Sequence, residues 1–373
     1  MNVRILADKH LYHAEKMAPT SAELSFFEPA NGLPADAADY DALLIRTVSR
    51  INSDTLPVAG NLSFIGTATA GFDHVDREHL ERIGVRFAHS PGCNARAVAE
   101  YVLTAILRWS HIRKQTTEDL RVGVVGCGNT GSAVIDLLSA FEIGYAAYDP
   151  PRAISEPHFV SASEDELLSC NILTFHTPLT LAGPHSTFHM LSSSWLRSPF
   201  QLIINAARGG VVDERALLDA IHRGTLRDCV LDVWEHEPAF SDTVAQSAFI
   251  ATPHIAGYSR EAKTAATRMV LEQLCEHFSL EMPASAEPAV PDHALPVFSE
   301  TPELADFLWE INKVDYYDSE LRKLKEHPDA VKSDGFNRLR TSTPTRFEYA
   351  TLIAHFKRHG VKNIPEEAER LIK

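Results

Sequence analysis

The stretch VVGCGNTG, Val124 to Gly131, constrains the fold more than any other part of this sequence. Its glycines follow an apolar run, RVGVV, and precede a segment with apolar residues at helical spacing. This order is typical of the first βαβ unit of a dinucleotide-binding domain, in which the backbone approaches a pyrophosphate at the helix N-terminus. A second run, YAAYD, ends at Asp149. A carboxylate there binds ribose hydroxyls and repels a 2'-phosphate, which indicates NAD rather than NADP.

The position of this loop is unusual, because about a third of the chain precedes it. Short apolar runs alternate with helix-length segments before it, and we expect strands at 3–8, 42–46, 64–71 and 85–90. A second series begins at the loop, with strands expected within 121–126, 172–179, 202–209, 229–234 and 249–257. Such alternation predicts parallel sheets. We therefore expect the nucleotide-binding domain to be inserted into another α/β domain.

The predicted domain boundaries follow from these patterns. A doubly wound Rossmann-type domain is expected over 94–257, and a split substrate-binding domain over 1–93 and 258–282. The proline-rich stretch 283–296 predicts a linker. Residues 297–373 show helical periodicity without a catalytic motif and are predicted to form a small oligomerisation domain.

The first helix of that C-terminal domain is predicted to have Thr301 as N-cap and Pro302 as first helical residue. Between the inner strands, a further helix is expected to begin after Asp213 and to stop at Gly224.

Composition excludes several classes of protein. The net charge of -15 disfavours nucleic acid as a partner, because such binding depends on cationic side chains. No apolar stretch approaches the length of a membrane span, and the first residues resemble a strand and not a signal peptide, so we expect a cytoplasmic protein without a membrane partner.

The five cysteines lie far apart without a CxxC pair, which indicates reduced thiols.

Three motifs near predicted strand ends carry groups suited to catalysis. INAARGGVVDERAL places Arg208 where open α/β sheets bind ligands, and a guanidinium there can hold a carboxylate. LDVWEHEP offers Asp232, Glu235 and Glu237, and TPHIAGY offers His254. A carboxylate bonded to an imidazole favours the protonated ring and suits the pair for proton exchange near neutral pH.

Histidines also cluster in TFHTPLTLAGPHSTFHML, as His176, His185 and His189. The last two lie one helical turn apart and raise the question of a metal site. The segment contains no carboxylate or cysteine, so we predict no metal.

The motifs GCGNTG, NAARGGVVDERAL, LDVWEHEP and TPHIAG, in this order, resemble the D-isomer-specific 2-hydroxyacid dehydrogenases. The resemblance implies NAD as cofactor and a nucleotide domain inserted into a flavodoxin-like α/β substrate domain. The segments GTATAGFDHVD, SPGCNA, SELRKLK and DGFNRLR are similar to members that oxidise a small phosphorylated 2-hydroxyacid. Those members imply a homodimer formed through an α+β C-terminal domain.

The resemblance also implies residue roles. Arg208 corresponds to the arginine that binds the substrate carboxylate, Glu237 to the acid that supports the histidine, and His254 to the acid/base. Thr47, which stands where we expected serine, Thr69 and Tyr258 correspond to substrate contacts. The residues expected to bind NAD are Gly126, Cys127, Gly128, Asn129, Thr130, Gly131, Asp149, Thr177, Ala206, Ala207, Arg208, Asp232 and Gly257.

The phosphate contact and the exact substrate stay open. Arg46, at a predicted strand end, is the candidate for the phosphate, and the alternative for this residue is a surface or interdomain salt bridge. One alternative is that the chain is a dehydrogenase of the same family that acts on 3-phosphoglycerate or a glyoxylate-type acid, with the same chemistry and a different pocket. An NAD(H)-sensing regulatory protein would keep the fold and could retain all three catalytic residues.

Overall fold

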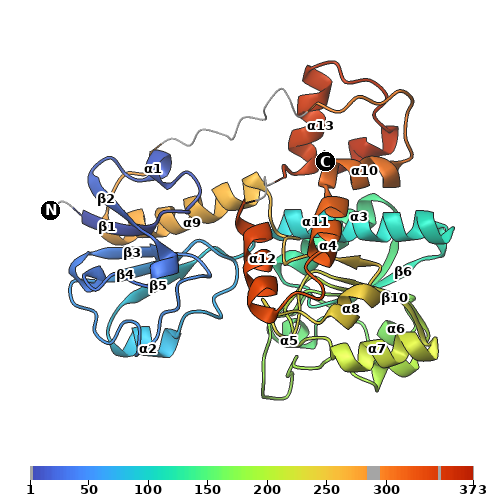
Figure 1. The fold of residues 1–373 in the computed structure, drawn as a ribbon, viewed down its shortest axis with the longest axis horizontal. Coiled ribbons are helices and arrows are strands. Elements are labelled where there is room, and N and C mark those ends of the chain that lie inside the picture. Colours follow the sequence, from blue (N-terminus) through green and yellow to red (C-terminus); the bar gives the residue numbers. More distant parts are fainter. Residues whose placement is uncertain (1–2, 284–294, 343–345, 373) are drawn as a thin grey trace. The chain divides into compact units, whose positions relative to one another are not determined.

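The computed structural model describes residues 3–283, 295–342 and 346–372 (Figure 1). These residues form two compact units. The first comprises the described parts of Met1–Asn94 and Ser259–Ala289, and the second those of Ala95–Tyr258 and Val290–Lys373. Most of the predicted linker, at 284–294, lies outside the described residues.

The first unit is built on a five-stranded parallel sheet of order β2-β1-β3-β4-β5. This is the strand order of flavodoxin-like folds, as expected. Its strands are β1 (Val3–Asp8), β2 (Ala22–Phe27), β3 (Ala42–Ile45), β4 (Phe64–Thr67) and β5 (Arg86–His89). Strand β2 was not predicted, because this edge strand is mostly half-exposed and lacks a continuous apolar run.

Helices cover both faces of this sheet (Figure 1). Helices α1 (Ala14–Met17) and α9 (Arg260–Phe278) pack on one face, and α2 (Arg77–Arg82) contributes Leu80 to the core on the other. A Cβ atom on Gly66 of β4 would lie 2.3 Å from a methyl carbon of Val270, so the glycine allows α9 to approach the sheet. Short 3-10 turns lie at Pro29–Asn31 and Ala37–Asp39.

The second unit contains a six-stranded parallel sheet of order β11-β10-β9-β8-β6-β7. The chain runs from β6 outward to β7 and then returns to the other side of β6 to form β8, so the sheet is doubly wound. Its strands are β6 (Arg121–Val125), β7 (Gly144–Tyr148), β8 (Ile172–Phe175), β9 (Phe200–Asn205), β10 (Leu226–Leu231) and β11 (Ile250–Ala251). The predicted Rossmann-type architecture is confirmed.

Helices sandwich this sheet as well (Figure 1). The largely buried α3 (Ala95–Arg113) and α4 (Asn129–Ala140) cover one face, and α6 (Glu164–Leu168), α7 (Glu214–Arg223) and α8 (Asp242–Ser247) cover the other. Helix α5 (Pro150–Ser155) follows β7, and 3-10 turns lie at Thr117–Asp119 and Trp195–Arg197. The predicted limits of α7 are confirmed: Asp213 caps the amide of Ala216, and Gly224 has a φ of 74°.

The C-terminal segment consists of α10 (Leu304–Asn312), α11 (Val314–Arg322), α12 (Asp329–Ser342), α13 (Tyr349–Arg358) and a 3-10 helix at Glu366–Leu371. It differs from the expected separate α+β domain. No strand occurs among its described residues, and it belongs to the second unit, whose core it shares through Phe307, Tyr349 and Phe336. The helix start predicted at Thr301 and Pro302 is wrong, because α10 begins two residues after the proline.

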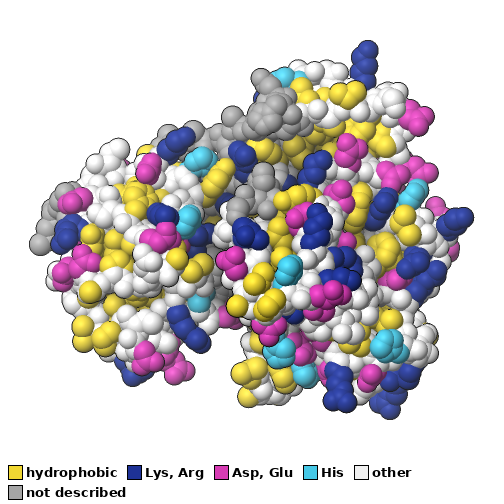
Figure 2. Space-filling model, in the orientation of Figure 1, with side chains coloured by type: hydrophobic (Ala, Val, Ile, Leu, Met, Phe, Trp, Pro, Cys, Tyr) yellow, Lys and Arg dark blue, Asp and Glu magenta, His cyan; other side chains and the backbone are white. Residues whose placement is uncertain are grey.

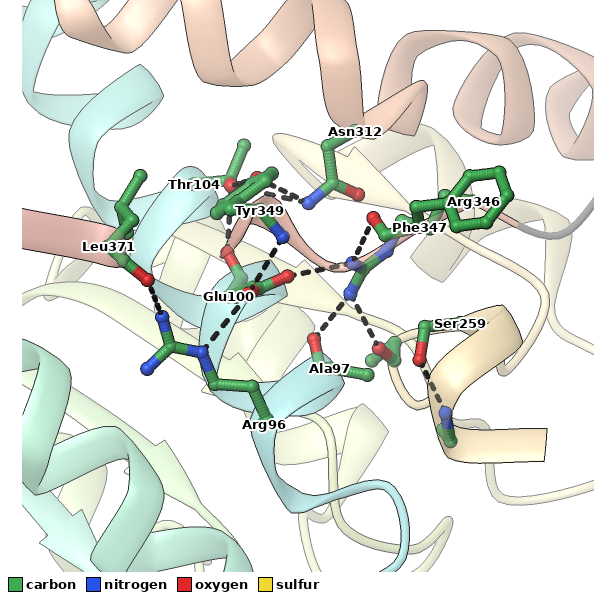
Figure 3. A network of polar contacts seen from close by, with 12 residues as sticks. Arg96, Ala97, Glu100, Thr104, Ser259, Asn312, Arg346, Phe347, Tyr349 and Leu371 are labelled. Atoms are coloured by element: carbon green, nitrogen blue, oxygen red, sulfur yellow. Dashed lines mark hydrogen bonds and ion pairs between the residues drawn. The ribbon is translucent and has the colours of Figure 1, made fainter. Parts of the chain in front are cut away.

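A buried polar network fixes this segment to α3 (Figure 3). Glu100 of α3 is fully buried and lies 3.1 Å from Nε of Arg96 and 2.9 Å from Nη1 of Arg346. The backbone amide of Tyr349 also donates to Glu100, over 3.0 Å. Burial raises the pKa of Glu100, although both arginines favour its ionised form. Because removing one partner of a buried ion pair is costly, the network holds the start of α13 in place.

Acidic and basic side chains are interspersed over the face shown in Figure 2, so no single charge sign dominates it. Among the described helices, none combines the length and apolar character needed to cross a bilayer.

Candidate active site

All six strands of the second unit are parallel, so their carboxyl ends meet at one edge of the sheet. The predicted site residues follow these ends. The glycine loop comes after β6, Asp149 after β7 and Thr177 after β8. In the same way, Arg208 comes after β9, Glu237 after β10 and His254 after β11. This edge is where open α/β sheets bind ligands.

The glycine loop is tightly folded at two positions and open at a third. Gly126 has a φ of 85°, and a Cβ atom there would lie 2.7 Å from a carbon of Thr177. On Gly131 it would lie 1.9 Å from the carbonyl oxygen of Gly126, so α4 packs directly on the turn. Apart from Gly128 itself and its chain neighbours, no heavy atom of the described residues lies within 4 Å of a Cβ built on Gly128, the N-cap of α4. The backbone is thus accessible where a pyrophosphate would bind.

Asp149 is held beside this loop by backbone donors. Its Oδ2 accepts from the amide of Cys127 at 2.8 Å, and its Oδ1 from the amide of Arg152 at 3.0 Å. The guanidinium of Arg152 contacts the carbonyl of Cys127 and donates to the hydroxyl of Ser132 over 3.1 Å. The carboxylate therefore stands at the end of the loop, where the adenosine ribose of NAD would lie.

Two buried polar atoms next to the glycine loop lack partners among the described residues. They are Oγ1 of Thr177 and Nδ1 of His176. Burial lowers the pKa of His176 to about 3, so its ring is neutral. Because buried polar atoms normally have a hydrogen-bond partner, the unpaired hydroxyl of Thr177 is suited to a ligand. Together with the exposed backbone at Gly128, it shows that this edge fits a dinucleotide.

His254 and Glu237, two of the three catalytic candidates, are in direct contact. Nδ1 of His254 lies 2.7 Å from Oε2 of Glu237, and both side chains are partly accessible. Burial by itself would raise the pKa of Glu237, but His254 and the amide of Trp234, which donates over 3.0 Å, outweigh burial and lower it. The ionised carboxylate can only accept, so Nδ1 carries a proton, and in the tautomer with this proton alone Nε2 keeps a lone pair.

Asp232 organises the loop that carries His254. It accepts hydrogen bonds from the hydroxyl of Thr252 at 2.6 Å and from the amides of Ile255 and Ala256 at 2.7 and 2.9 Å. Between these contacts, His254 adopts a φ of 57°, and its amide donates to the carbonyl of Asp232 over 2.7 Å. Burial raises the pKa of Asp232 against the opposing effect of His254 and these donors. The structure thus brings a second acid of the LDVWEHEP motif into contact with the loop that carries His254.

The loop that bears Arg208 is fixed by Asn205 at the end of β9. The side chain of Asn205 accepts from the amide of Ala207 and donates to the carbonyl of Arg208, both over 3.1 Å. Nη1 of Arg208 donates to the carbonyl of Ala207 at 2.8 Å. A Cβ atom on Gly209 would lie 1.7 Å from the carbonyl oxygen of Trp234. Only glycine allows this approach, which brings the Arg208 loop against the loop leading to Glu237.

Glu235 belongs to a different cluster that sequence reasoning missed. Its Oε1 lies 2.9 Å from Nε2 of His189, and Oδ2 of Asp213 lies 3.8 Å from Nδ1 of the same ring. One ligand atom from each of these three residues lies within 4.8 Å of the others, as in a metal site. The segment that holds the histidines has no carboxylate of its own, whereas Asp213 and Glu235 come from later loops. The expectation that no metal binds stays a prediction.

The predicted substrate residues lie in both units. In the first unit, Thr47 is exposed after β3, and Thr69 donates to the carbonyl of Gly71 at 2.7 Å. Nε of Arg46 donates over 3.1 Å to the fully buried carboxylate of Asp8. In the second unit, the hydroxyl of Tyr258 accepts from Arg340. Sequence reasoning missed Arg340, whose motif, DGFNRLR, was assigned only to the C-terminal domain.

Comparison with known proteins agrees with this geometry. Residues 96–256 match the family model described as D-isomer specific 2-hydroxyacid dehydrogenase, NAD binding domain. The erythronate-4-phosphate dehydrogenase of Bacteroides thetaiotaomicron is 33% identical over 350 residues, which cover 93% of this chain and 97% of the relative. The enzyme of the same name from Escherichia coli O127:H6 is 39% identical over 294 residues, covering 78% and 77%.

A solved structure supports the fold. The D-lactate dehydrogenase of Aquifex aeolicus, determined with NAD and lactic acid, matches with a TM-score of 0.59 and 23% identity over 74% of this chain and 95% of that one. The nucleotide loop, the strand-end residues and these matches lead to one conclusion. The chain belongs to the erythronate-4-phosphate dehydrogenases within the D-isomer-specific 2-hydroxyacid dehydrogenase family.

Proposed function

We propose that this NAD-dependent oxidoreductase oxidises C2 of 4-phospho-D-erythronate to give (R)-3-hydroxy-2-oxo-4-phosphooxybutanoate, in the biosynthesis of pyridoxal 5'-phosphate. The observation that carries the chemistry is the 2.7 Å contact between His254 and Glu237. Glu237 follows β10, which lies next to β9, the strand that precedes Arg208. The erythronate-4-phosphate dehydrogenases that match most of the chain support the choice of substrate.

His254 is proposed as the general base. Its Nε2 accepts the proton of the C2 hydroxyl, the electron pair of the broken O–H bond forms the second bond of the carbonyl, and the electron pair of the C2–H bond leaves with the hydrogen as hydride. Bound NAD supplies the acceptor for the hydride. Glu237 stabilises the imidazolium that results, because its carboxylate is ionised and already bonded to Nδ1.

Arg208 is proposed to hold the substrate carboxylate and to orient C2. A guanidinium can bind a carboxylate through two parallel hydrogen bonds, which fixes the direction of the hydroxyl relative to the base. In well-oriented reactions, fixing the reacting groups in this way lowers the activation barrier by on the order of 7 kcal/mol or more.

The NAD contacts and the first unit's substrate contacts remain part of this proposal. The accessible backbone at Gly128, the unpaired hydroxyl of Thr177 and the position of Asp149 support the NAD contacts. Arg46 stays a candidate for the phosphate, although its Nε is engaged by Asp8.

We further propose a homodimer formed through the C-terminal segment and a cytoplasmic location. Partly exposed Tyr316 and Val331, on α11 and α12, are apolar side chains that a second subunit could cover. Sedimentation at micromolar concentration is expected to give twice the mass of 41.3 kDa, and a monomer would contradict the proposed assembly.

The substrate is tested by comparing product formation from 4-phospho-D-erythronate, 3-phosphoglycerate and erythronate. Each acid is incubated with NAD alone, where NADH absorbance at 340 nm is followed, and with NAD and a 2-oxoacid that reoxidises tightly bound cofactor, where the 2-oxo product of the tested acid is measured. We expect selective oxidation of 4-phosphoerythronate. Oxidation of 3-phosphoglycerate alone would assign another substrate, and no turnover with any of the acids would favour an NAD(H)-sensing protein.

A further inference from the structure

Helix α12 brings a basic side chain from the C-terminal segment to the active-site edge. Nη2 of Arg340 donates a hydrogen bond to the hydroxyl of Tyr258 over 3.1 Å, and its guanidinium lies 5.8 Å from the centre of that ring. Tyr258 follows His254 by four residues and is one of the proposed substrate contacts. Arg340 therefore lies beside a proposed substrate contact, on the segment that follows His254.

The helix that carries Arg340 is tied to the loop that carries Glu237. The buried ammonium of Lys332 lies 3.3 Å from the carbonyl oxygen of Phe240 and 3.3 Å from Oδ1 of Asp242. Phe336 is fully buried, and its ring centre lies 6.1 Å from that of Phe240, three residues after Glu237. These contacts fix where α12 presents its last turn.

Arg340 has one donor for which the described part of the chain offers no acceptor. Its Nε is buried and has no hydrogen-bond partner among the described residues. Burial alone would lower the pKa of Arg340, but the Tyr258 hydroxyl and the carboxylates of Glu237 and Asp232 outweigh burial and raise it. The side chain is thus a half-buried cation whose buried Nε has no acceptor among the described residues, and a buried donor without a partner is costly.

We propose that Arg340 binds the phosphate group of the substrate, beside Tyr258. The inference rests on the proposed function, in which the substrate carries one carboxylate and one phosphate. Arg208 is assigned to the carboxylate, so the phosphate needs another cation, and guanidinium bonds to phosphate oxygens are among the strong charge-assisted ones. Arg340 belongs to the same compact unit as Arg208 and His254, whereas Nε of Arg46 already binds a buried carboxylate.

The experiment compares Arg340→Gln and Arg340→Lys with Arg338→Gln in the full-length protein. Arg338 lies on the same helix, is largely exposed and pairs with Asp334 over 3.8 Å, so its replacement controls for loss of a positive charge on α12. For each protein, kcat and KM are measured with 4-phosphoerythronate and with erythronate. Inhibition by inorganic phosphate and the Kd for NADH are measured in parallel.

Arg340→Gln is expected to lower kcat/KM for 4-phosphoerythronate by about 10- to 100-fold, mainly through KM, and to weaken phosphate inhibition similarly. Activity on erythronate and the Kd for NADH should change less than about threefold by the same reasoning. Arg340→Lys should recover part of the loss, and Arg338→Gln should match the wild type. An equal loss on both substrates, or unchanged phosphate inhibition, would overturn the assignment and leave Arg340 a support for Glu237.

The wild-type control separates this inference from the proposed function. If the wild type oxidised 3-phosphoglycerate and not 4-phosphoerythronate, the proposed substrate would be wrong. Arg340 would then be tested with 3-phosphoglycerate against glycerate, and only a selective loss with the phosphorylated acid would support it.

Discussion

Nδ1 of His254 lies 2.7 Å from Oε2 of Glu237, although the two residues are 17 positions apart and follow different strands. Each is fixed from its own side: the amide of Trp234 donates to Glu237, and three donors to Asp232 shape the loop around His254. The contact engages Nδ1 and leaves Nε2 of the imidazole for its proposed part in the reaction, the removal of the proton of a substrate hydroxyl.

Glu237→Gln is expected to lower kcat by about 100-fold or more, within the range typical of an acid–base contribution. An amide can still accept from Nδ1 but does not stabilise the imidazolium with a charge. Steady-state rates with saturating NAD and substrate check this, and NADH fluorescence should show unchanged cofactor binding. A rate near that of the wild type would remove Glu237 from the reaction.

Gly128→Ala and Gly131→Ala are expected to fail in different ways. A methyl group on Gly128 meets no described atom within 4 Å, so the melting temperature should change little while NAD binding weakens. A methyl group on Gly131 would lie 1.9 Å from the Gly126 carbonyl oxygen and should destabilise the fold itself. Thermal unfolding without cofactor and NADH titration separate the two effects. NADH binding by Gly128→Ala equal to that of the wild type would show that the pyrophosphate lies elsewhere.

Glu214→Gln is expected to change how stability depends on pH. Burial, with the nearby charges of Glu235 and Glu237, raises the pKa of Glu214 from 4.5 to about 7. Between these values the folded state binds more protons than the unfolded state, so the contribution of Glu214 to stability falls as pH rises through this window. The free energy of unfolding of the variant relative to the wild type should therefore increase from pH 4.5 to pH 8, by at most about 3 kcal/mol.

Denaturant unfolding at several pH values measures this difference. The exposed Asp219 lies on the same helix, and Asp219→Asn serves as the matched control. A difference between Glu214→Gln and the wild type that did not vary with pH would contradict the assigned ionisation.

Local signals predicted most of the sheet and the strand-end residues. Asp213 and Gly224 set the limits of α7 because a cap and a left-handed stop act within a few residues. Edge strand β2 was missed, since a half-exposed strand needs no continuous apolar run. The contacts of Glu235 with His189 and of Arg340 with Tyr258 join segments 46 and 82 residues apart, and no local pattern specifies such pairs.

The most direct test of the account is the turnover of His254→Asn with 4-phosphoerythronate. Single-turnover formation of NADH is measured at enzyme concentrations above that of substrate, together with the Kd for NADH. An asparagine cannot take the hydroxyl proton at neutral pH, so the rate should fall by about 100-fold or more, with a Kd within about threefold of the wild type, as expected for a group acting only in the chemical step. A rate close to that of the wild type would contradict the assignment of His254 as the general base.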